Sequence, residues 1–249
     1  MNLIYVAKHA ASEAMKIADK FFKNPKVLSS KSKDIKTLVD IEMNKCIVEN
    51  LKSTQFSIIS EEIEKRPTKI PNQCWIIDPL DGTYNFTRKF PVVGISIAFF
   101  DNGKPVLGLV QDIFNKNIYH SEAGGGSKKN GFKIKVSNVS ELKNAILSMG
   151  FPSGTSYESK ELFDVVSLVQ KFKKIRAIGC ASLMLSYVAE GVFDVYYEKD
   201  IYLWDVAAGL SLVKEAGGRI YFKKTNNYKY EVLAANNKIF SKAKKNLIK

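Results

Sequence analysis

The second half of the chain alternates between short apolar runs typical of strands and longer segments in which apolar residues recur at helical spacing. Because strands that alternate with helices pack as layers, this order predicts a sheet covered by helices, an α/β arrangement. The expected strands are 145–149, 174–178, 193–197, 219–222 and 231–234, and the expected helices are 157–172, 181–190, 204–216 and a last one from Lys238.

The first half predicts two helices followed by a mostly antiparallel sheet. Apolar residues keep a helical period over 2–23 and again over 37–51, with a polar, lysine-rich loop expected between them. We therefore expect an α+β / α/β fold with an N-terminal α+β subdomain at 1–140 and a C-terminal α/β subdomain at 141–249. The expected strands of the first part are 56–59, 74–77, 92–100, 105–111 and 117–121, and Asn130-Gly131 is a hairpin signal.

The two halves of the chain differ in net charge. The 249 residues include 38 Lys and Arg against 25 Asp and Glu, a net charge of +13. Residues 125–249 hold 21 basic and 11 acidic side chains (+10), whereas residues 1–124 hold 17 and 14 (+3). Such a balance suits a nucleic acid, a membrane surface or a small anion, and composition alone leaves the three open.

Cysteine usage and hydropathy indicate the cellular compartment in which the protein is expected. Cys46, Cys74 and Cys180 are widely spaced, so they form neither a disulfide framework nor a CxxC metal clip, which favours a reducing cytoplasm. No window approaches the roughly 18 apolar residues of a membrane-spanning helix. We therefore expect a cytoplasmic protein with no membrane partner.

The most informative chemistry lies in 75–86, which reads WIIDPLDGTYNF. An apolar strand ends in Asp78 and Asp81, Gly82 permits a sharp turn, and Thr83 is expected to cap a helix whose free backbone N–H groups face the carboxylates. Carboxylates and an anion bound at a helix start are both negatively charged and would repel each other. A divalent cation that binds both the carboxylates and a phosphate allows them to share one site. Taken alone, however, this DxxDG sequence is equally typical of an ordinary turn.

Two further carboxylates weaken the interpretation as a turn. Glu61 follows a second apolar strand, and Asp205 lies at the start of an apolar helix. An aspartate at a helix start is usually only a cap, but the three segments together indicate a shared acidic site.

Segments 78–86 and 204–218 resemble the two signatures of the inositol monophosphatase family, within the lithium-sensitive, magnesium-dependent sugar phosphatases. DPLDGTYNF resembles D-P-[IL]-D-G-T-x-N-F, and WDVAAGLSLVKEAGG resembles W-D-x-[AS]-A-G…EAGG. The resemblance extends from the first helix to Ile220 at least, and it implies a layered αβαβα sandwich. Tyr84 resembles the residue at this position in archaeal and some bacterial members, the archaeal-like branch, which often hydrolyses both inositol 1-phosphate and fructose 1,6-bisphosphate.

The resemblance also implies a site and a reaction. Two to three Mg²⁺ ions, with Mn²⁺ as a substitute, would activate a water that attacks the phosphate ester, in a protein that is commonly a homodimer. The implied metal ligands are Glu61, Asp78, the carbonyl of Leu80, Asp81 and Asp205. The implied catalytic residues are Asp40, Thr83 and Glu61, and the implied substrate contacts are Asp81, Gly82, Thr83, Gly179, Cys180, Ala181 and Glu198.

The substrate stays open at this point. Arg176, in the basic run 173–176, or the Arg88-Lys89 pair could bind a second phosphate, and which lysine of 31–36 contacts the site is undecided. The runner-up activity is a 3′(2′),5′-bisphosphate nucleotidase. A basic nucleic-acid-binding protein is disfavoured, because the sequence shows no basic stripe with interleaved aromatic residues. The aromatic residues that could stack on adenine are Tyr157, Phe163 and Phe172.

Overall fold

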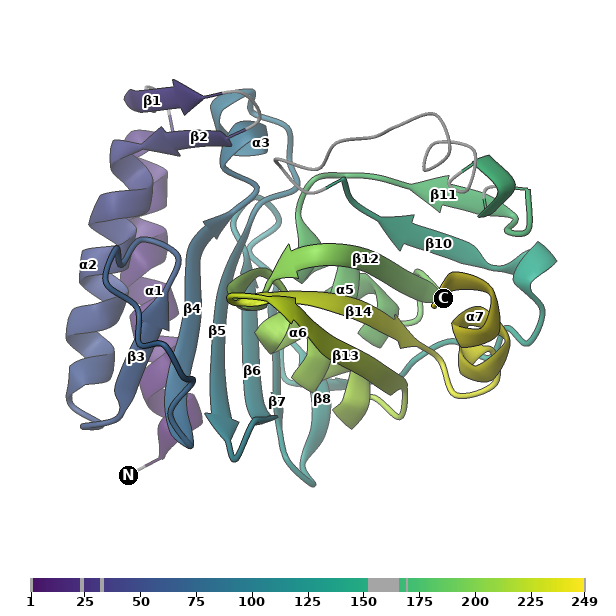
Figure 1. The fold of residues 1–249 in the computed structure, drawn as a ribbon. Coiled ribbons are helices and arrows are strands. Elements are labelled where there is room, and N and C mark those ends of the chain that lie inside the picture. The colour runs from purple at the N-terminus through teal and green to yellow at the C-terminus, as the bar shows by residue number, and fades with distance from the viewer. Residues whose placement is uncertain (1, 23–24, 32–33, 152–165, 169, 249) are drawn as a thin grey trace.

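The computed structural model describes residues 2–22, 25–31, 34–151, 166–168 and 170–248, and its elements stack in five layers, α–β–α–β–α (Figure 1). The layered αβαβα sandwich expected from the sequence is confirmed. None of the helices in the described ranges combines the length and hydropathy that a bilayer crossing requires.

The first two layers come from the N-terminal half. Helices α1 (Leu3–Phe21) and α2 (Leu38–Lys52) cover one face of a seven-stranded sheet of order β3-β4-β5-β6-β7-β8-β9 (Figure 1). Only β3 and β4 pair in parallel; the other pairs are antiparallel, as the sequence predicts. The strands are β3 (Ser57–Ser60), β4 (Gln73–Asp81), β5 (Gly94–Asp101), β6 (Lys104–Asp112), β7 (Ile118–Glu122), β8 (Gly126–Lys129) and β9 (Phe132–Ile134).

Strand β4 is the second strand of this sheet, and both of its faces are apolar because helices cover each of them. Trp75 and Ile77 pack with α1 and α2, whereas Cys74 and Ile76 face the opposite helical layer. Successive side chains of a strand point to opposite faces, so burial on both sides requires an unbroken apolar run. This run delivers the two aspartates to one edge of the sheet.

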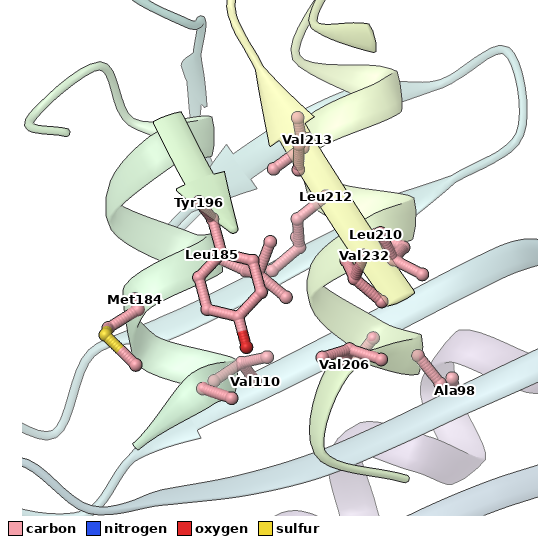
Figure 2. Close-up of a cluster of buried hydrophobic side chains, with 14 of the residues drawn as sticks. Ala98, Val110, Met184, Leu185, Tyr196, Val206, Leu210, Leu212, Val213 and Val232 are labelled. Atoms are coloured by element: carbon pink, nitrogen blue, oxygen red, sulfur yellow. The ribbon is translucent and has the colours of Figure 1, made fainter. Parts of the chain in front are cut away.

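The middle layer consists of α5 (Ala181–Ala189) and α6 (Leu203–Glu215), which pack between the two sheets. Figure 2 shows Leu185 of α5 and Val206 of α6 beside Ala98 and Val110 of the first sheet and Val232 of the second. The helices approach so closely that no side chain fits at certain glycines. A Cβ on Gly108 would lie 2.3 Å from the Ala208 carbonyl oxygen, and one on Gly209 would lie 2.4 Å from the Leu185 Cβ.

The last two layers come from the C-terminal half. The five-stranded sheet has the order β11-β10-β12-β14-β13, and α7 (Phe240–Leu247) packs on its outer face. Strand β10 runs parallel to β11 and β12, so the carboxyl ends of these three strands meet at one edge. The strands are β10 (Ile146–Met149), β11 (Lys174–Arg176), β12 (Val195–Tyr202), β13 (Arg219–Asn226) and β14 (Lys229–Ala235).

Some sequence expectations change in the structure. The lysine-rich segment expected to be a loop forms a hairpin of β1 (Val27–Lys31) and β2 (Asp34–Thr37), because its residues pair in an antiparallel ladder. The helix expected at 157–172 lies mostly outside the described residues. The division at residue 140 stays a prediction, and one apolar cluster joins α5 and α6 to both sheets.

Candidate active site

Three carboxylates from distant parts of the chain meet at the end of β4. Glu61 follows β3, Asp78 lies near the end of β4, and Asp205 lies in the first turn of α6. Each residue offers an oxygen, and these oxygens all lie within 4.8 Å of one another. The three carboxylates expected from the sequence to form an acidic site therefore lie close together in the structure.

Hydrogen bonds fix the elements that carry two of these carboxylates. The backbone N–H of Leu80 donates to Asp78 Oδ1 at 2.9 Å, which holds the carboxylate against its own strand. Across the layer, the Ser96 hydroxyl donates to the Trp204 carbonyl at 2.9 Å, and this bond ties the start of α6 to the first sheet. The position of Asp205 thus follows from the packing of α6 on β5.

Asp81 is held by a different element. Its Oδ2 accepts the backbone N–H of Ser182 at 2.7 Å and the Cys180 thiol at 3.1 Å, both at the start of α5. A carboxylate at a helix N-terminus is stabilised by the free N–H groups and by the helix dipole. Burial nevertheless dominates and raises the pKa of Asp81.

The turn after β4 departs from the expected capping pattern. Gly82, with φ of +92°, is the N-cap residue, and the short helix α3 (Thr83–Thr87) begins at Thr83 itself. A side chain is disfavoured at Gly82 for two reasons: its left-handed backbone, and the Val92 carbonyl, which would lie 3.0 Å from a Cβ. The expectation that Thr83 caps this helix is therefore wrong, because glycine takes that position.

Thr83 instead reaches α2. Its hydroxyl lies 2.8 Å from Asp40 Oδ1 and 3.0 Å from the Leu80 carbonyl oxygen, and it can donate to either acceptor. The other Asp40 oxygen accepts from the backbone N–H of Thr37 at 2.7 Å and from the Thr37 hydroxyl at 2.5 Å. Burial raises the pKa of Asp40 to about 6, while hydrogen bonds from Thr37 and Thr83 oppose that rise. The structure therefore pairs Asp40 with Thr83, as expected.

Glu198 comes from the second sheet and is buried. The Tyr196 hydroxyl donates to its Oε2 at 2.8 Å, and burial raises its pKa to about 7. A Cβ on Gly150, at the end of β10, would lie only 2.4 Å from that oxygen. The carboxylate of Glu198 thus lies in space that a side chain at position 150 would fill.

The turn at 178–180 is joined to α3 by Asn85. The Asn85 amide donates to the Ile178 carbonyl at 2.8 Å and to the Val92 carbonyl at 2.9 Å. Gly179, with φ of +68°, precedes Cys180, the N-cap residue of α5, and Ala181, its first residue. The turn predicted to line the pocket therefore lies against the Gly82 turn, since a Cβ on Gly82 would lie 3.3 Å from the Gly179 carbonyl oxygen.

Arg176 and the lysines at 31–36 are the basic residues considered for contacts with the substrate or the site. Arg176 lies at the carboxyl end of β11, and its guanidinium donates to the Ile175 carbonyl at 2.9 Å. Of the lysines at 31–36, Lys36 pairs with Glu62 at 2.5 Å, beside Glu61, while the side chains of Lys31 and Lys33 lie outside the described residues. A second-phosphate contact by Arg176 stays a prediction.

The whole chain was compared with known proteins. A family model described as the inositol monophosphatase family matches residues 1–248. The chain belongs to the inositol monophosphatase family. Its relatives include Nus factor SuhB of Xylella fastidiosa, 37% identical over 197 residues (78% of this chain, 71% of the relative). Inositol-1-monophosphatase of Rhizobium meliloti is also 37% identical, over 164 residues (66% of this chain, 62% of the relative).

Solved structures of similar proteins share the fold over their full length. The suhB protein of Bartonella henselae matches with a TM-score of 0.88 and 29% identity, covering 100% of this chain and 99% of that one. Inositol monophosphatase from Anabaena (Nostoc) sp. matches with a TM-score of 0.85 and 28% identity, covering 99% and 94%. Inositol monophosphatase family membership supports a phosphatase, and a dependence on metal ions is general in the family.

The donor set of this inositol monophosphatase family member fits a hard divalent cation. Burial, and then the negative charge of Glu61, raises the pKa of Asp78 and of Asp205 well above the usual range. Burial and the neighbouring Glu62 raise the pKa of Glu61 to about 8. Burial and mutual repulsion thus disfavour the ionised form of each carboxylate when no cation is present. A cation bound by the carboxylate oxygens would offset this repulsion, and oxygen-only ligands suit Mg²⁺ or Mn²⁺.

Sequence reasoning missed several residues that shape this site. Arg66, Ser182 and Tyr196 each contact a proposed site residue or its backbone. Tyr196 alone carried a signal, since it lies two residues before Glu198 and so points to the same face of β12. Ser182 acts through a backbone N–H, and Arg66 lies in a polar connection, so neither stands out in the sequence.

Proposed function

We propose that the protein is a Mg²⁺-dependent phosphatase that hydrolyses small sugar or inositol phosphate monoesters by attack of an activated water. The observation that carries the proposal is the meeting of Glu61, Asp78 and Asp205 within 4.8 Å, at the end of a strand followed by the Gly82 turn. Inositol 1-phosphate and fructose 1,6-bisphosphate are the expected substrates.

The residues that would bind two to three Mg²⁺ ions supply only oxygen ligands. When bound, Mg²⁺ neutralises charge on the phosphoryl group and lowers the pKa of the attacking water. Phosphoryl transfer needs this neutralisation and accurate positioning more than covalent help from the protein. The proposed ligands are Glu61, Asp78, the Leu80 carbonyl, Asp81 and Asp205.

Asp40 and Thr83 would handle the proton of the attacking water. Thr83 donates its hydroxyl proton to Asp40 and can accept a proton from the water in its place. With its pKa raised to about 6, Asp40 is ionised at neutral pH and is a better base than an ordinary aspartate. The backbone N–H groups of Gly82 and Thr83 would bind the phosphate oxygens.

The substrate alcohol would contact the opposite side of the site. Glu198 is acceptor-only when ionised, so it can accept a hydrogen bond from a sugar or inositol hydroxyl. The 179–181 turn would line the same pocket, and Arg176 would bind the second phosphate of a bisphosphate substrate. Together these contacts favour a small polyhydroxyl ester.

A substrate panel tests the proposal. Phosphate release is measured from inositol 1-phosphate, fructose 1,6-bisphosphate and 3′-phosphoadenosine 5′-phosphate, with and without Mg²⁺ and Li⁺. We expect Mg²⁺-dependent release, inhibited by Li⁺, from one or both of the first two esters. Asp205→Asn should abolish release while circular dichroism stays unchanged, because one charged ligand is lost. No release from any ester, or full activity of Asp205→Asn, would contradict the proposal.

One of the three aromatic residues considered for stacking on adenine is buried, which weakens the nucleotidase alternative. Phe172 is only 6% exposed and packs in the core beneath the second sheet, so its ring is not free to stack on adenine. Tyr157 and Phe163 lie outside the described residues. Preferential release from 3′-phosphoadenosine 5′-phosphate would favour the nucleotidase. A cytoplasmic homodimer that binds no nucleic acid remains part of the proposal, and sedimentation velocity and filter binding test the dimer and the nucleic acid, respectively.

A further inference from the structure

Arg66 contacts the backbone that carries one proposed metal ligand. The residue lies in the connection between β3 and β4 and is half-buried. Its Nε donates to the Ser60 carbonyl at 2.9 Å, and its Nη2 donates to the Glu61 carbonyl. One guanidinium therefore binds two successive carbonyls, and the second belongs to Glu61 itself.

The same guanidinium also contacts the element that carries another proposed ligand. Its Cζ lies 4.4 Å from the centroid of the Trp204 ring, and Trp204 directly precedes Asp205. Trp204 is 2% exposed and stacks on Tyr202 with centroids 4.6 Å apart, so the indole is a fixed surface. Stacking of a guanidinium on an indole is a favourable cation–π contact.

A second contact holds the connection against the C-terminal half. The Tyr228 hydroxyl donates to the carbonyl of Pro67, and the Tyr228 ring lies 5.9 Å from that of Trp204. Residues 66 and 67 are thus attached to the aromatic cluster of Tyr202, Trp204 and Tyr228. This attachment joins the chain after β3 to the start of α6.

We propose that Arg66 is a positioning residue that holds Glu61 in the acidic site, beside Asp78 and Asp205, so that the site can bind divalent cations. The proposal rests on the metal site of the proposed function. The planar guanidinium suits this role because it donates in a fixed fork while its face stacks on an aromatic ring. Without it, both carbonyls lose a donor, and the Glu61 turn loses its attachment to α6.

The direction in which the cation affinity changes distinguishes two possible roles of Arg66. Removing a positive charge beside an acidic site strengthens cation binding if Arg66 acts only through its charge. Removing a residue that positions Glu61 weakens cation binding, by about 10- to 100-fold for partners that orient metal ligands. The two roles therefore predict opposite shifts of the dissociation constant.

The experiment measures Mn²⁺ binding to the full chain by isothermal titration calorimetry, with no substrate present. We expect Arg66→Ala to bind Mn²⁺ about 10- to 100-fold more weakly than the native protein. Arg66→Lys keeps the charge but not the fork, so its binding should also be weaker than native. Lys65→Ala, which removes the same charge from the exposed neighbour, should bind as the native protein does.

Kinetics separates positioning from general damage. In the phosphate-release assay, Arg66→Ala should raise the half-saturating Mg²⁺ concentration by the same factor and regain most of kcat at high Mg²⁺. If Arg66→Ala does not fold, as judged by circular dichroism, the Arg66→Lys variant decides. Native or tighter Mn²⁺ binding by the folded Arg66 variants overturns the proposal.

The outcomes for Arg66 and for the proposed function are distinguishable. Unchanged Mn²⁺ binding by the variants of an active phosphatase overturns the role of Arg66 and leaves the function intact. If the native protein binds Mn²⁺ but releases no phosphate, the function fails while the variants still decide the role of Arg66. A native protein that binds no Mn²⁺ overturns both.

Discussion

At the scale of single residues, the proposed reaction depends on how burial changes carboxylate chemistry. Asp40 and Glu198 are both buried, with their pKa raised to about 6 and about 7, and each accepts hydrogen bonds from neighbouring hydroxyls. Asp40 accepts from Thr83 and Glu198 accepts from Tyr196. The two hydroxyls differ in their surroundings, because Thr83 lies beside the acidic group whereas Tyr196 is fully buried in the core.

The activity should rise with pH through about 6. Asp40 must be ionised to accept the proton from Thr83, and burial raises its pKa to about 6. The acidic limb of kcat/KM, measured with inositol 1-phosphate at saturating Mg²⁺, should therefore have its midpoint near pH 6. A limb near pH 4, the value of an ordinary aspartate, would contradict this role for Asp40.

Variants of Thr83 are the control for that assignment. Thr83→Ala removes the hydroxyl between the water and Asp40, so kcat should fall by about 10²- to 10⁴-fold while Mn²⁺ affinity changes little. Thr83→Ser keeps the hydroxyl and should retain most of the activity. Equal activity of the Ala and Ser variants would show that the hydroxyl takes no part.

At the scale of elements, the site depends on how closely α5 and α6 pack between the sheets. Asp81 is held by the start of α5, and Asp205 is placed by α6. Both helices approach the first sheet at glycines, and the Ser96–Trp204 bond fixes the start of α6. Small residues at the contact therefore determine how the start of α5 holds Asp81 of β4 and where α6 places Asp205.

Gly108→Ala should destabilise the protein and weaken metal binding together. The new methyl would lie 2.3 Å from the Ala208 carbonyl oxygen, so α6 has to shift away from β6. Overpacking of this kind costs about 1–3 kcal/mol in the free energy of unfolding, measured by urea denaturation. Gly125→Ala is the matched control, because its methyl would meet nothing closer than 3.3 Å. Equal stability of the two variants would contradict the close-packing argument.

At the scale of the whole molecule, the buried carboxylates of the proposed metal site should oppose folding when no cation is bound. Its carboxylates come from β4, α6 and the chain after β3, so they meet only in the folded state. Folding therefore creates the repulsion and the proposed cation site together. Stability should consequently depend on pH and on divalent cations at the same time.

Without divalent cations, the protein should lose stability as pH rises from about 5 to 8. The pKa of Glu61 rises from 4.5 to about 8 on folding, and that of Glu198 rises to about 7. The folded state thus holds more protons than the unfolded state over this range, so the free energy of unfolding falls as pH rises. Thermal unfolding in EDTA at pH 5 and pH 8 measures this change.

Added Mg²⁺ should reverse that loss. Its stabilisation should be larger at pH 8 than at pH 5, because ionised carboxylates bind the cation and protonated ones do not. Asp205→Asn is the comparison variant, and its thermal midpoint should respond less to Mg²⁺. A midpoint in EDTA that does not depend on pH would contradict the linkage.

Much of the fold and the site followed from local sequence. The apolar run before Asp78, the alternation of strands and helices and the two motifs predicted the layers and the identity of the acidic residues. The hairpin at 27–37 was missed, because its polar residues pair with each other and not with a core. The role of Gly82 as the N-cap residue was also missed, since the capping preference of Thr83 was overridden by the turn that follows β4.

The sequence alone determined which residues are acidic, most of the strands and helices, and which family the motifs resemble. Only the tertiary structure decided that Glu61, Asp78 and Asp205 meet within 4.8 Å, that Asp81 is held by the start of α5, and that Arg66 contacts Trp204. The physical reason is that local patterns record burial and backbone preference within a few residues. Contacts between segments more than a hundred residues apart depend on the packing of whole layers.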